Sequence, residues 1–498
     1  MTKNTTSKKL IPPPFAPGLP HVACVLLWYP LFTQPFIFRE VQGLRRRLPV
    51  AVYSLYGPNL RHCSTEMRNV ARETITMGTR TLPAILAEVL RQMFTHPVRL
   101  GRIFRRTMFR RWRCIETLGE NLWAFCAGVY LARRFREAGI DMIYAPWPRG
   151  TATAAWVAGS LAGLPFATCA RGDNLEPADP DLGDKLEAAF LVRANNAADK
   201  GRIESFADGQ ARGKVELVYN GLTLPPLEES RPPADSDASA ESTPVENMPC
   251  ASASAEGTAA DQAHAADSVC SAAGADVGAF PHLEPVGPSD APEPMPRPVR
   301  LLALGRFDVT KGFDVLLRAC GILREQGLDF RLTLAGGGGK AMGLGCMQAE
   351  LTRLCKELKL EGHVTMPGLI SHNELPRLLG EHHIFAAPCI VHASGRRDGI
   401  PNTVIEALAY GLPVVSTTVN ALPEVVRHGK TGLAVPQGDA AALAEAIALL
   451  AGDAGLAAGL ARNGRLLAAH MFDPEANNDR LARIFTNNYK CWKESCAE

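Results

Sequence analysis

Short apolar runs alternate with longer polar stretches of helical spacing along most of the chain. Such runs, bounded by Gly, Pro, Asn or Asp, are typical of strands buried on both faces. The expected strands cover residues 22–28, 51–55, 140–145, 163–168, 214–219, 299–304, 330–335, 363–366, 384–387 and 414–415. Regular alternation of strand and helix predicts an α/β fold with doubly wound parallel sheets.

One long stretch interrupts this alternation. Residues 226–297 are dense in Ala, Ser, Pro and acidic residues and have few large apolar side chains, so we expect a disordered insertion. It separates an N-terminal Rossmann-like domain, 21–225, from a C-terminal one, 298–470. Residues 1–20 are expected to be a flexible terminus, and 471–498 a helix that packs back on the N-terminal domain.

The composition excludes several classes of protein. The chain has 498 residues, 46% of them hydrophobic, which is enough for two cores, and its formal net charge of +2 does not favour nucleic-acid binding. Its 13 cysteines include no C-x-x-C pair, which argues against a disulfide framework or a zinc ribbon and favours a reducing cytosol. His382, His383 and His392 have no carboxylate or cysteine at a recognisable metal spacing, so no metal is expected.

The segment 91–113 combines arginines with aromatic and other apolar residues. Its arginines are Arg91, Arg99, Arg102, Arg105, Arg106, Arg110, Arg111 and Arg113. This mixture on a helix suits the surface of an anionic membrane. It suits equally a solvated helix whose apolar side packs inward, and the sequence leaves both interpretations open.

The richest stretch for function is 392–415. Asp398 opens a polar turn, Pro401 suits the first turn of a helix, and the helix carries Glu406 and ends at Gly411. A helix start offers unpaired N–H groups and a positive dipole end to a phosphate, and carboxylates bind sugar hydroxyls. The pattern indicates a nucleotide-sugar site, although a solvated loop would show the same two acids.

Other expected strand ends carry related features. Arg306 and Lys311 follow the strand 299–304, where they could bind a pyrophosphate, and four glycines, 336–339, follow the strand 330–335. The loop 29–36 follows the first strand. Ligands of open parallel sheets bind at these strand ends. Each feature alone is also common in ordinary surface loops.

The order of five motifs resembles a known family. These are GRFDVTKGFDVLL, LTLAGGGG, VTMPGLISHNEL, DGIPNTVIEALAYGLPVVST and LPEVVRHGKTGLAVP, within residues 299–436. Together they resemble the C-terminal domain of retaining GT-B glycosyltransferases of group 1, or family 4, and are similar to bacterial exopolysaccharide and colanic-acid-type members. YPLFTQPFIFREVQGLRRR, GLPFATCARGDN and KVELVYNGL resemble the weaker N-terminal motifs.

The resemblance implies two Rossmann-like domains facing a cleft, with a nucleotide-sugar held mainly by the C-terminal domain. By this resemblance Arg306 and Lys311 bind the diphosphate, Glu406 the ribose and Asp398 the transferred sugar. The implied donor-binding set is Gly305, Arg306, Lys311, Gly337, Met366, Gly368, Gly399, Ile400, Pro401, Asn402, Thr403 and Glu406. Thr33, Gln34 and Phe36 are placed on the acceptor side. No metal or other cofactor is implied.

Two residues depart from the family pattern. Asp398 replaces the usual Glu, which shortens the side chain and keeps its charge, and Arg171 replaces a His that commonly lies near the reacting sugar. By the resemblance, the expected catalytic residues are Asp398, Glu406 and Arg171. Whether Arg171 takes over the role of the family's His is left open.

The resemblance implies a retaining transferase that moves a hexose from a UDP- or GDP-sugar to a saccharide or lipid-linked acceptor in cell-surface polysaccharide synthesis. It would be cytoplasmic or peripheral at the inner face of the cytoplasmic membrane, with no nucleic-acid partner. The alternative is a catalytically silent nucleotide-sugar-binding protein that serves as a partner or regulator. A GT-B epimerase fits the motifs less well.

Overall fold

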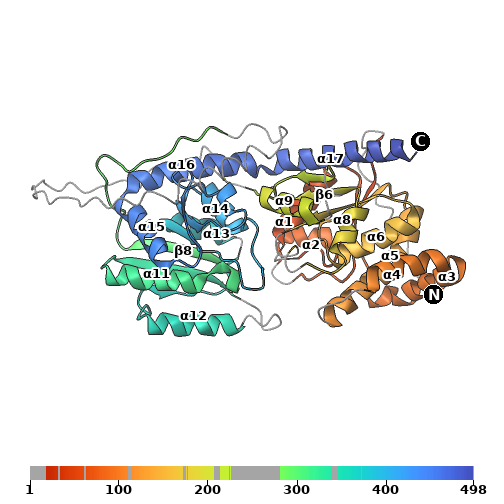
Figure 1. The fold of residues 1–498 in the computed structure, drawn as a ribbon, viewed down its shortest axis with the longest axis horizontal. Helices are drawn as coiled ribbons and strands as arrows, with labels where there is room; N and C mark the ends of the chain where they lie inside the picture. The colour runs from red at the N-terminus through yellow and green to blue at the C-terminus, as the bar shows by residue number, and fades with distance from the viewer. Residues whose placement is uncertain are drawn as a thin grey trace, which may run out of the picture. The chain divides into compact units, whose positions relative to one another are not determined.

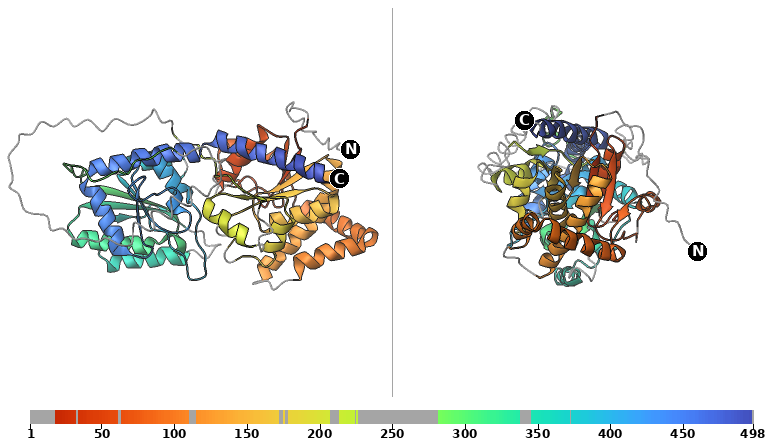
Figure 2. Two further views of the ribbon diagram at one scale, coloured as in Figure 1. Left: turned by 45° about the horizontal axis from the view of Figure 1, so that its top comes forward. Right: turned by 90° about the vertical axis from the view of Figure 1, so that its right-hand side faces the viewer.

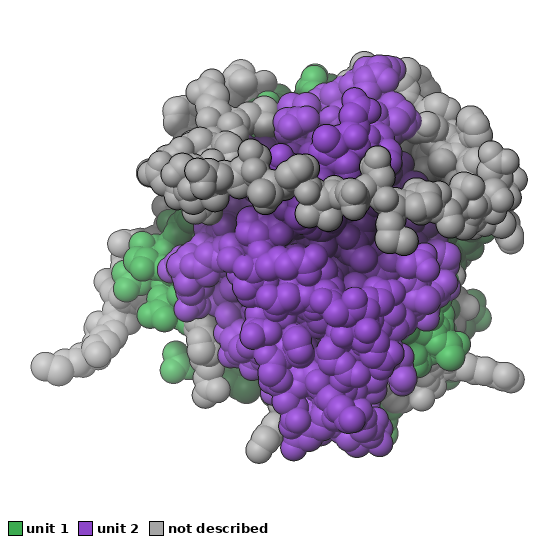
Figure 3. Space-filling view, turned by 90° about the vertical axis from the view of Figure 1, so that its left-hand side faces the viewer, with its two compact units in different colours: residues 1–223, 390–401, 471–498 green, residues 224–389, 402–470 purple. Residues whose placement is uncertain are grey.

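A computed structural model of the chain describes most of its residues. These are residues 18–31, 34–60, 63–109, 115–171, 175, 178–206, 213–223, 225, 281–337, 345–371 and 373–496. The chain divides into two compact units, which are coloured separately in Figure 3. Unit 1 comprises residues 1–223, 390–401 and 471–498, and unit 2 comprises 224–389 and 402–470. Each unit is described by itself.

Unit 1 is built on a parallel sheet in the order β3-β2-β1-β4-β5-β6-β7. Its strands are β1 (Val22–Leu26), β2 (Val50–Ser54), β3 (Ile75–Thr76), β4 (Met142–Ala145), β5 (Phe166–Ala170), β6 (Leu191–Ala194) and β7 (Val215–Leu217). The order reverses between β1 and β4. In open parallel sheets such a reversal leaves a crevice at the carboxyl ends of the strands.

Helices cover both faces of this sheet (Figures 1 and 2). They are α1 (Pro35–Arg45), α2 (Thr65–Ala71), α3 (Leu82–Thr95), α4 (Pro97–Met108), α5 (Ile115–Glu137), α6 (Gly150–Ala162), α8 (Leu182–Ala188), α9 (Ala197–Phe206) and α17 (Pro474–Ser495). Because successive strand residues point to opposite faces, Ala23 and Val25 join the core formed with α5 and α6. Cys24 and Leu26 join the core formed with α1 and α17.

Unit 2 repeats the arrangement with a parallel sheet in the order β10-β9-β8-β11-β12-β13. Its strands are β8 (Val299–Arg306), β9 (Phe330–Gly337), β10 (Val364–Thr365), β11 (Ile384–Ala387), β12 (Val414–Thr417) and β13 (Leu433–Val435). Its helices are α11 (Phe313–Glu325), α12 (Gly345–Glu357), α13 (Leu375–Glu381), α14 (Asn402–Ala409), α15 (Ala440–Gly452) and α16 (Ala454–Met471). The predicted fold, two Rossmann-like α/β units with parallel sheets, is confirmed.

The C-terminal helix α17 packs on unit 1. The ring of Phe485 meets that of Tyr144 edge-on, with 4.9 Å between centroids. Glu475, in the first turn of α17, pairs with Arg46 at 2.7 Å and with Arg47 at 2.6 Å, both near the end of α1. The helix thus covers α1 and the face of the sheet beside it.

Two expectations about the organisation are wrong. The sequence of residues 60–113 looks helical, but the short strand β3 pairs with β2 within it and α3 ends before Pro97. The expected disordered insertion does not reach residue 297, because residues 281–297 pack on unit 2. Residues 1–17 and 226–280 lie outside the described residues.

Hydrogen bonds and buried side chains hold residues 281–297 against the rest of unit 2. Val286 N–H donates to the carbonyl oxygen of Gly429 at 2.7 Å, and Met295 N–H to that of Ala451 at 2.9 Å. Leu283 and Met295 are buried. A segment poor in apolar residues is thereby ordered through a few anchors, which composition does not reveal.

Within the described part of the chain, no single helix is long and apolar enough to span a membrane. One pair, Ala440–Gly452 and Ala454–Ser495, meets the criteria of length and composition when taken together, with a bend of 103° between its members.

Candidate functional site

Three glycines meet where β8 and β9 end in unit 2. Gly305 is paired with Gly336 in the sheet, and the N–H of Gly336 donates to the carbonyl oxygen of Gly368 at 2.8 Å. Gly336 has φ +151°, and a β-carbon there would lie 1.7 Å from the Gly305 carbonyl oxygen. Only glycine fits at Gly336, and this edge of the sheet therefore presents bare backbone, which a ligand can approach closely.

Lys311 lies against this edge. Asp308 caps the 3₁₀ turn Val309–Lys311 by accepting hydrogen bonds from the N–H and hydroxyl of Thr310, at 3.1 and 3.0 Å. A β-carbon on Gly305 would lie 3.2 Å from Cε of Lys311, so the aliphatic part of the lysine covers that glycine. Lys311 is buried, whereas Arg306 is exposed. The turn fixes one cation at the end of β8.

The helix α14 begins beside the same strand end. The hydroxyl of Thr403, in its first turn, donates to the carbonyl oxygen of Leu304 at 3.3 Å. Half-buried Glu406 follows one turn later, and the helix ends before Gly411, which has φ +73°. The predicted helix and its end are confirmed. The structure therefore brings Gly305, Lys311 and the start of α14 together, and it places the free N–H groups of a helix start beside a cation.

The remaining predicted donor residues of unit 2 lie at the ends of β9 and β10. Half-buried Met366 follows β10, and Gly368 is bonded to Gly336 as described. A β-carbon on Gly337 would lie 3.6 Å from Cγ of Leu369, a largely exposed residue that sequence reasoning did not select. These residues line the edge on the side away from α14.

The loop 390–401 belongs to unit 1, although the elements on either side of it belong to unit 2. Within unit 1, a β-carbon on Gly399 would lie 3.1 Å from Nδ2 of Asn196, which precedes α9. Asp398, Gly399, Ile400 and Pro401 therefore fall in one unit, and Asn402, Thr403 and Glu406 in the other. The predicted donor set is divided between two units.

Arg171 follows β5 in unit 1 and is 5% exposed. Its guanidinium carbon lies 5.0 Å from the ring centre of Phe36 and 5.1 Å from that of Trp147. Its Nη1 donates to Oδ1 of Asn220 at 3.0 Å, whereas its Nε is buried and makes no hydrogen bond. The structure thus brings together two predicted residues, Arg171 and Phe36, and holds the arginine between two aromatic rings.

A buried carboxylate holds Arg171 from the other side. Oε2 of Glu40, on α1, lies 3.4 Å from Nη2 of Arg171 and also accepts a hydrogen bond from Nη1 of Arg193. The hydroxyl of Tyr144 donates to Oε1 of Glu40 at 2.7 Å. Burial raises the pKa of Glu40, but Arg193 and Arg171 outweigh it and leave that pKa below its usual value. Two guanidinium groups thus share one carboxylate.

Sequence reasoning missed most of this network. Glu40 lies on the apolar face of α1, and Arg193 interrupts the buried strand Leu191–Ala194. A charged residue inside an apolar strand or on the apolar face of a helix is the signal that could have found both. Nothing in the sequence marked the three other members of the network as functional. Tyr144 lies near the end of one predicted strand, Trp147 comes after the same strand, and Asn220 follows another.

The acceptor-side residues are only partly described. Gln34 precedes α1, and its N–H donates to the carbonyl oxygen of Leu31 at 3.0 Å. Phe36 contacts Arg171 as described. Thr33 lies outside the described residues. Of the three acceptor-side residues, Phe36 is thus the one with a described contact to Arg171, and it lies in the first turn of α1 rather than in a loop.

The described residues contain no group of three His, Cys, Asp or Glu side chains placed to hold a metal ion. The ring nitrogens of His382 are within hydrogen-bonding distance of the Leu378 carbonyl oxygen, 2.7 Å, and the Thr333 hydroxyl, 2.8 Å. Burial also lowers the pKa of His382, in keeping with a neutral ring that packs inside unit 2.

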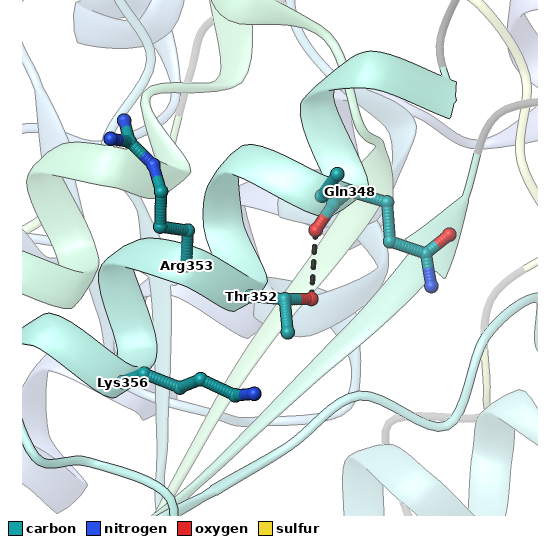
Figure 4. A pocket seen from close by; sticks show the side chains of 5 residues that line it. Gln348, Thr352, Arg353 and Lys356 are labelled. Atoms are coloured by element: carbon teal, nitrogen blue, oxygen red, sulfur yellow. Dashed lines mark hydrogen bonds between the residues drawn. The ribbon is translucent and has the colours of Figure 1, made fainter.

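A hollow of about 540 Å³ lies on the surface of unit 2, and Figure 4 shows side chains that line it. Its described lining residues all come from α12, namely Gln348, Ala349, Thr352, Arg353 and Lys356. The hydroxyl of Thr352 donates to the carbonyl oxygen of Gln348 at 2.8 Å, within the helix itself. Side chains from a single helix do not converge on a ligand, so this hollow is not the candidate site.

One known protein family matches the part of unit 2 that contains this site. Residues 298–453 match the family described as glycosyl transferases group 1. The match covers about a third of the chain, so it shows a similarity of this part to group 1 glycosyltransferases. The matched range contains the glycine edge, Lys311, α14 and the loop with Asp398.

Curated relatives match part of the chain. A putative colanic acid biosynthesis glycosyltransferase of Escherichia coli K12 is 33% identical over 188 residues, which cover 38% of this chain and 45% of that protein. An amylovoran biosynthesis glycosyltransferase of Erwinia amylovora is 37% identical over 148 residues, covering 30% and 35%. The chain thus spans less than half the length of either relative.

Solved structures of low sequence identity share the fold over nearly the whole chain. HepE of Anabaena, in complex with UDP and glucose, superposes with a TM-score of 0.58 at 16% identity and covers 94% of this chain and 100% of its own. Sucrose-phosphate synthase of Thermosynechococcus elongatus gives 0.60 at 16%, covering 95% and 100%. Both are GT-B glycosyltransferases, so the two units form a GT-B fold.

Proposed function

We propose that this protein is a retaining glycosyltransferase that moves a hexose from a UDP- or GDP-sugar to a saccharide or lipid-linked acceptor in cell-surface polysaccharide synthesis. The observation that carries the proposal is the meeting of Gly305, Lys311 and the start of α14 at one strand end. Bare backbone, a fixed cation and a helix N-terminus are the features that bind a diphosphate. The colanic acid and amylovoran relatives support an acceptor of the exopolysaccharide class.

In the proposed reaction the bond between the anomeric carbon and the diphosphate oxygen breaks, and its electron pair leaves with the nucleoside diphosphate. Lys311, Arg306 and the N–H groups of α14 stabilise the negative charge that develops on this leaving group. The acceptor hydroxyl forms the new bond on the same face of the sugar and gives its proton to the departing diphosphate oxygen. No metal is required in this proposal, because the cations and the helix dipole supply the electrostatic stabilisation.

Asp398 and Glu406 have binding roles in the proposal. Glu406 accepts hydrogen bonds from the ribose hydroxyls, and Asp398 binds the transferred sugar. Ile400 to Thr403 supply backbone N–H groups to the phosphates. These assignments follow the order of the residues around α14 and the resemblance of the motif.

A silent nucleotide-sugar-binding protein is the second candidate, and one observation favours it. Arg171 occupies the position where the family commonly has His, and it is fixed by Glu40, Asn220 and two aromatic rings. A guanidinium group stays protonated in proteins, so arginine is a poor proton acceptor. Donor binding without hydrolysis or transfer to any acceptor would favour this candidate.

Calorimetric titration of the purified chain with UDP, GDP, ADP and their common sugars tests the donor part. We expect selective binding of one nucleotide, weakened in Glu406→Ala and Lys311→Ala and unchanged in Lys356→Ala, a lysine on α12 outside the site. Hydrolysis and transfer assays with the bound donor then test the chemistry. Binding of no nucleotide would contradict the proposal.

The proposal includes attachment to the inner face of the cytoplasmic membrane, where a lipid-linked acceptor would be found. It is supported by the exposed arginines and apolar residues of α3 and α4. Arg91, Arg99, Arg102, Arg105 and Arg106 of this segment lie on the two helices; 110–113 lie outside the described residues.

A further inference from the structure

The helix α3 is turned the opposite way from an ordinary amphipathic helix. The side chains of Glu88 and Gln92 are buried, together with that of Ile85. Its exposed side instead carries large apolar residues at helical spacing, namely Leu82, Leu86, Leu90, Met93 and Phe94. Phe94 alone is 85% exposed. A continuous apolar stripe of this kind on a surface marks an interaction site.

Specific contacts hold α3 in this orientation. Glu88 accepts hydrogen bonds from Nε of Arg91 at 2.9 Å and from Nε2 of Gln92 at 3.0 Å, and it lies 3.7 Å from Nη1 of Arg133 on α5. Burial raises the pKa of Glu88, but its hydrogen bonds from Arg91 and Gln92 outweigh this and leave the pKa lowered. The buried carboxylate therefore stays charged, and turning the helix over would break this group.

An apolar groove of about 370 Å³ lies beside the stripe, between α3, α4 and α5. It is lined by Val89, Met93, Pro97, Leu100, Gly101, Phe104, Leu122, Phe125 and Cys126. Gly101 leaves part of it open, because a β-carbon at this position would meet no atom within 4 Å. Met93 belongs to both features, so the groove and the exposed stripe are continuous.

Positive charge gathers on α4, one of the helices that form the groove. The helix α4 exposes Arg102, Arg105 and Arg106 and contains no acidic residue. Val98, 74% exposed, lies on the same helix. Exposed apolar side chains beside clustered arginines match the two layers of an anionic membrane surface, its hydrocarbon and its phosphates. A second copy of the same face would bring like charges together.

We propose that α3 and α4 dock on an anionic membrane and that the groove takes the hydrocarbon chain of a lipid from it. Phe94, Leu90 and Val98 enter the boundary between headgroups and chains. Arg102 and Arg105 bind the lipid phosphates. This inference deepens the membrane part of the proposed function and rests on that part alone, since neither the donor nor the reaction enters it.

Filling the groove tests whether it holds a chain. Gly101→Leu should fold, because the site is open and leucine favours helix over glycine. We expect it to weaken binding to phosphatidylcholine vesicles containing about one third phosphatidylglycerol by roughly tenfold. Gly201→Leu, at an equally open glycine of α9, is the matched control and should bind normally. Unchanged vesicle binding by Gly101→Leu would overturn the groove assignment.

The reactivity of Cys126 shows directly whether a lipid chain occupies the groove, without any substitution in the protein. Its thiol lines the groove, whereas Cys491 is exposed on α17. Maleimide labelling, read by peptide mass spectrometry, should slow several-fold at Cys126 when the same vesicles are added, and remain unchanged at Cys491. Equal labelling of Cys126 with and without vesicles would show that no chain enters the groove.

Reversing the charge of two arginines on α4 tests whether they bind the anionic membrane surface. The double variant Arg102→Glu/Arg105→Glu should lose vesicle binding and its dependence on ionic strength. Arg353→Glu/Lys356→Glu, with the same change of charge on α12, should bind as before. If no protein sediments with vesicles at low salt, or if sedimentation equilibrium shows a dimer that Phe94→Ser dissociates, the proposal is wrong. Vesicle binding by a chain that binds no nucleotide would contradict the proposed donor and leave this inference standing.

Discussion

Gly336 approaches Gly305 so closely that a β-carbon on Gly336 would lie 1.7 Å from the Gly305 carbonyl oxygen. The two residues are paired across β8 and β9, and Lys311 packs over Gly305. The absence of a side chain at Gly336 therefore allows the strands to approach, and its absence at Gly305 leaves room for Lys311. The stability of unit 2 and the proposed donor binding therefore depend on the same few atoms.

Gly336→Ala should destabilise unit 2 by about 3 kcal/mol or more, because the new methyl group overlaps backbone and the residue has φ +151°. Peptide-resolved hydrogen exchange of β8 and β9 measures this loss. The six tryptophans all lie in unit 1, so their fluorescence should report normal unfolding there. Gly362→Ala, at an open position, is the control. Unaltered exchange in Gly336→Ala would show that the strand ends are less tightly packed than described.

Lys311→Met keeps the aliphatic stem that covers Gly305 and removes only the charge. We expect a fall in turnover of roughly a hundredfold to a thousandfold, the usual effect of losing one preorganised group that stabilises charge in a transition state. Thermal unfolding should change little, which separates the electrostatic role from packing. Steady-state kinetics with the donor identified by calorimetry gives the measurement, and Lys356→Met is the matched control. Turnover within twofold of the original would remove Lys311 from the site.

Glu40→Gln removes the carboxylate shared by Arg171 and Arg193. At neutral pH the loss should cost unit 1 about 3 to 5 kcal/mol, because two buried guanidinium groups lose their counter-charge. Urea unfolding followed by tryptophan fluorescence measures this quantity, since the signal comes from unit 1. Glu350→Gln, at an exposed position of α12, should have no effect.

The same pair of proteins has a defined pH dependence. The pKa of Glu40 is lowered by folding, so its stabilisation is complete above the ordinary glutamate pKa, about 4.3, and is lost as the pH falls through the folded value. The unfolding free energies of the original chain and Glu40→Gln should therefore converge in acid. A difference that stays constant down to the acid limit would show that Glu40 does not titrate with folding.

The two parallel sheets could be predicted from the sequence because buried parallel strands are short apolar runs. Gly305 and Lys311 could be placed at a strand end because they come just after the apolar run 299–304, and α14 could be predicted from Pro401 before it and Gly411 after it. The sequence could not show which residues meet across the sheet: Glu40, Arg171 and Arg193 come from α1, the end of β5 and β6, and nothing in their local sequence links them. The inverted face of α3 was hidden for the same reason, since Glu88 is buried only through partners that include Arg133 on α5.

The composition of residues 281–297 wrongly predicted disorder, because these residues pack on unit 2. Their contribution to its stability can be measured. Deleting 281–295 removes buried Leu283 and Met295 and the backbone hydrogen bonds of Val286 and Met295 to unit 2. We expect a loss of about 3 to 5 kcal/mol from unit 2, comparable to truncating a large buried side chain, seen as faster hydrogen exchange in α15. Deleting 265–279, which is equally long and contributes none of these contacts, should leave that exchange unchanged. The two deletions shorten the connection alike, so a difference between them must come from the anchors, and equal behaviour would mean that the anchors contribute nothing.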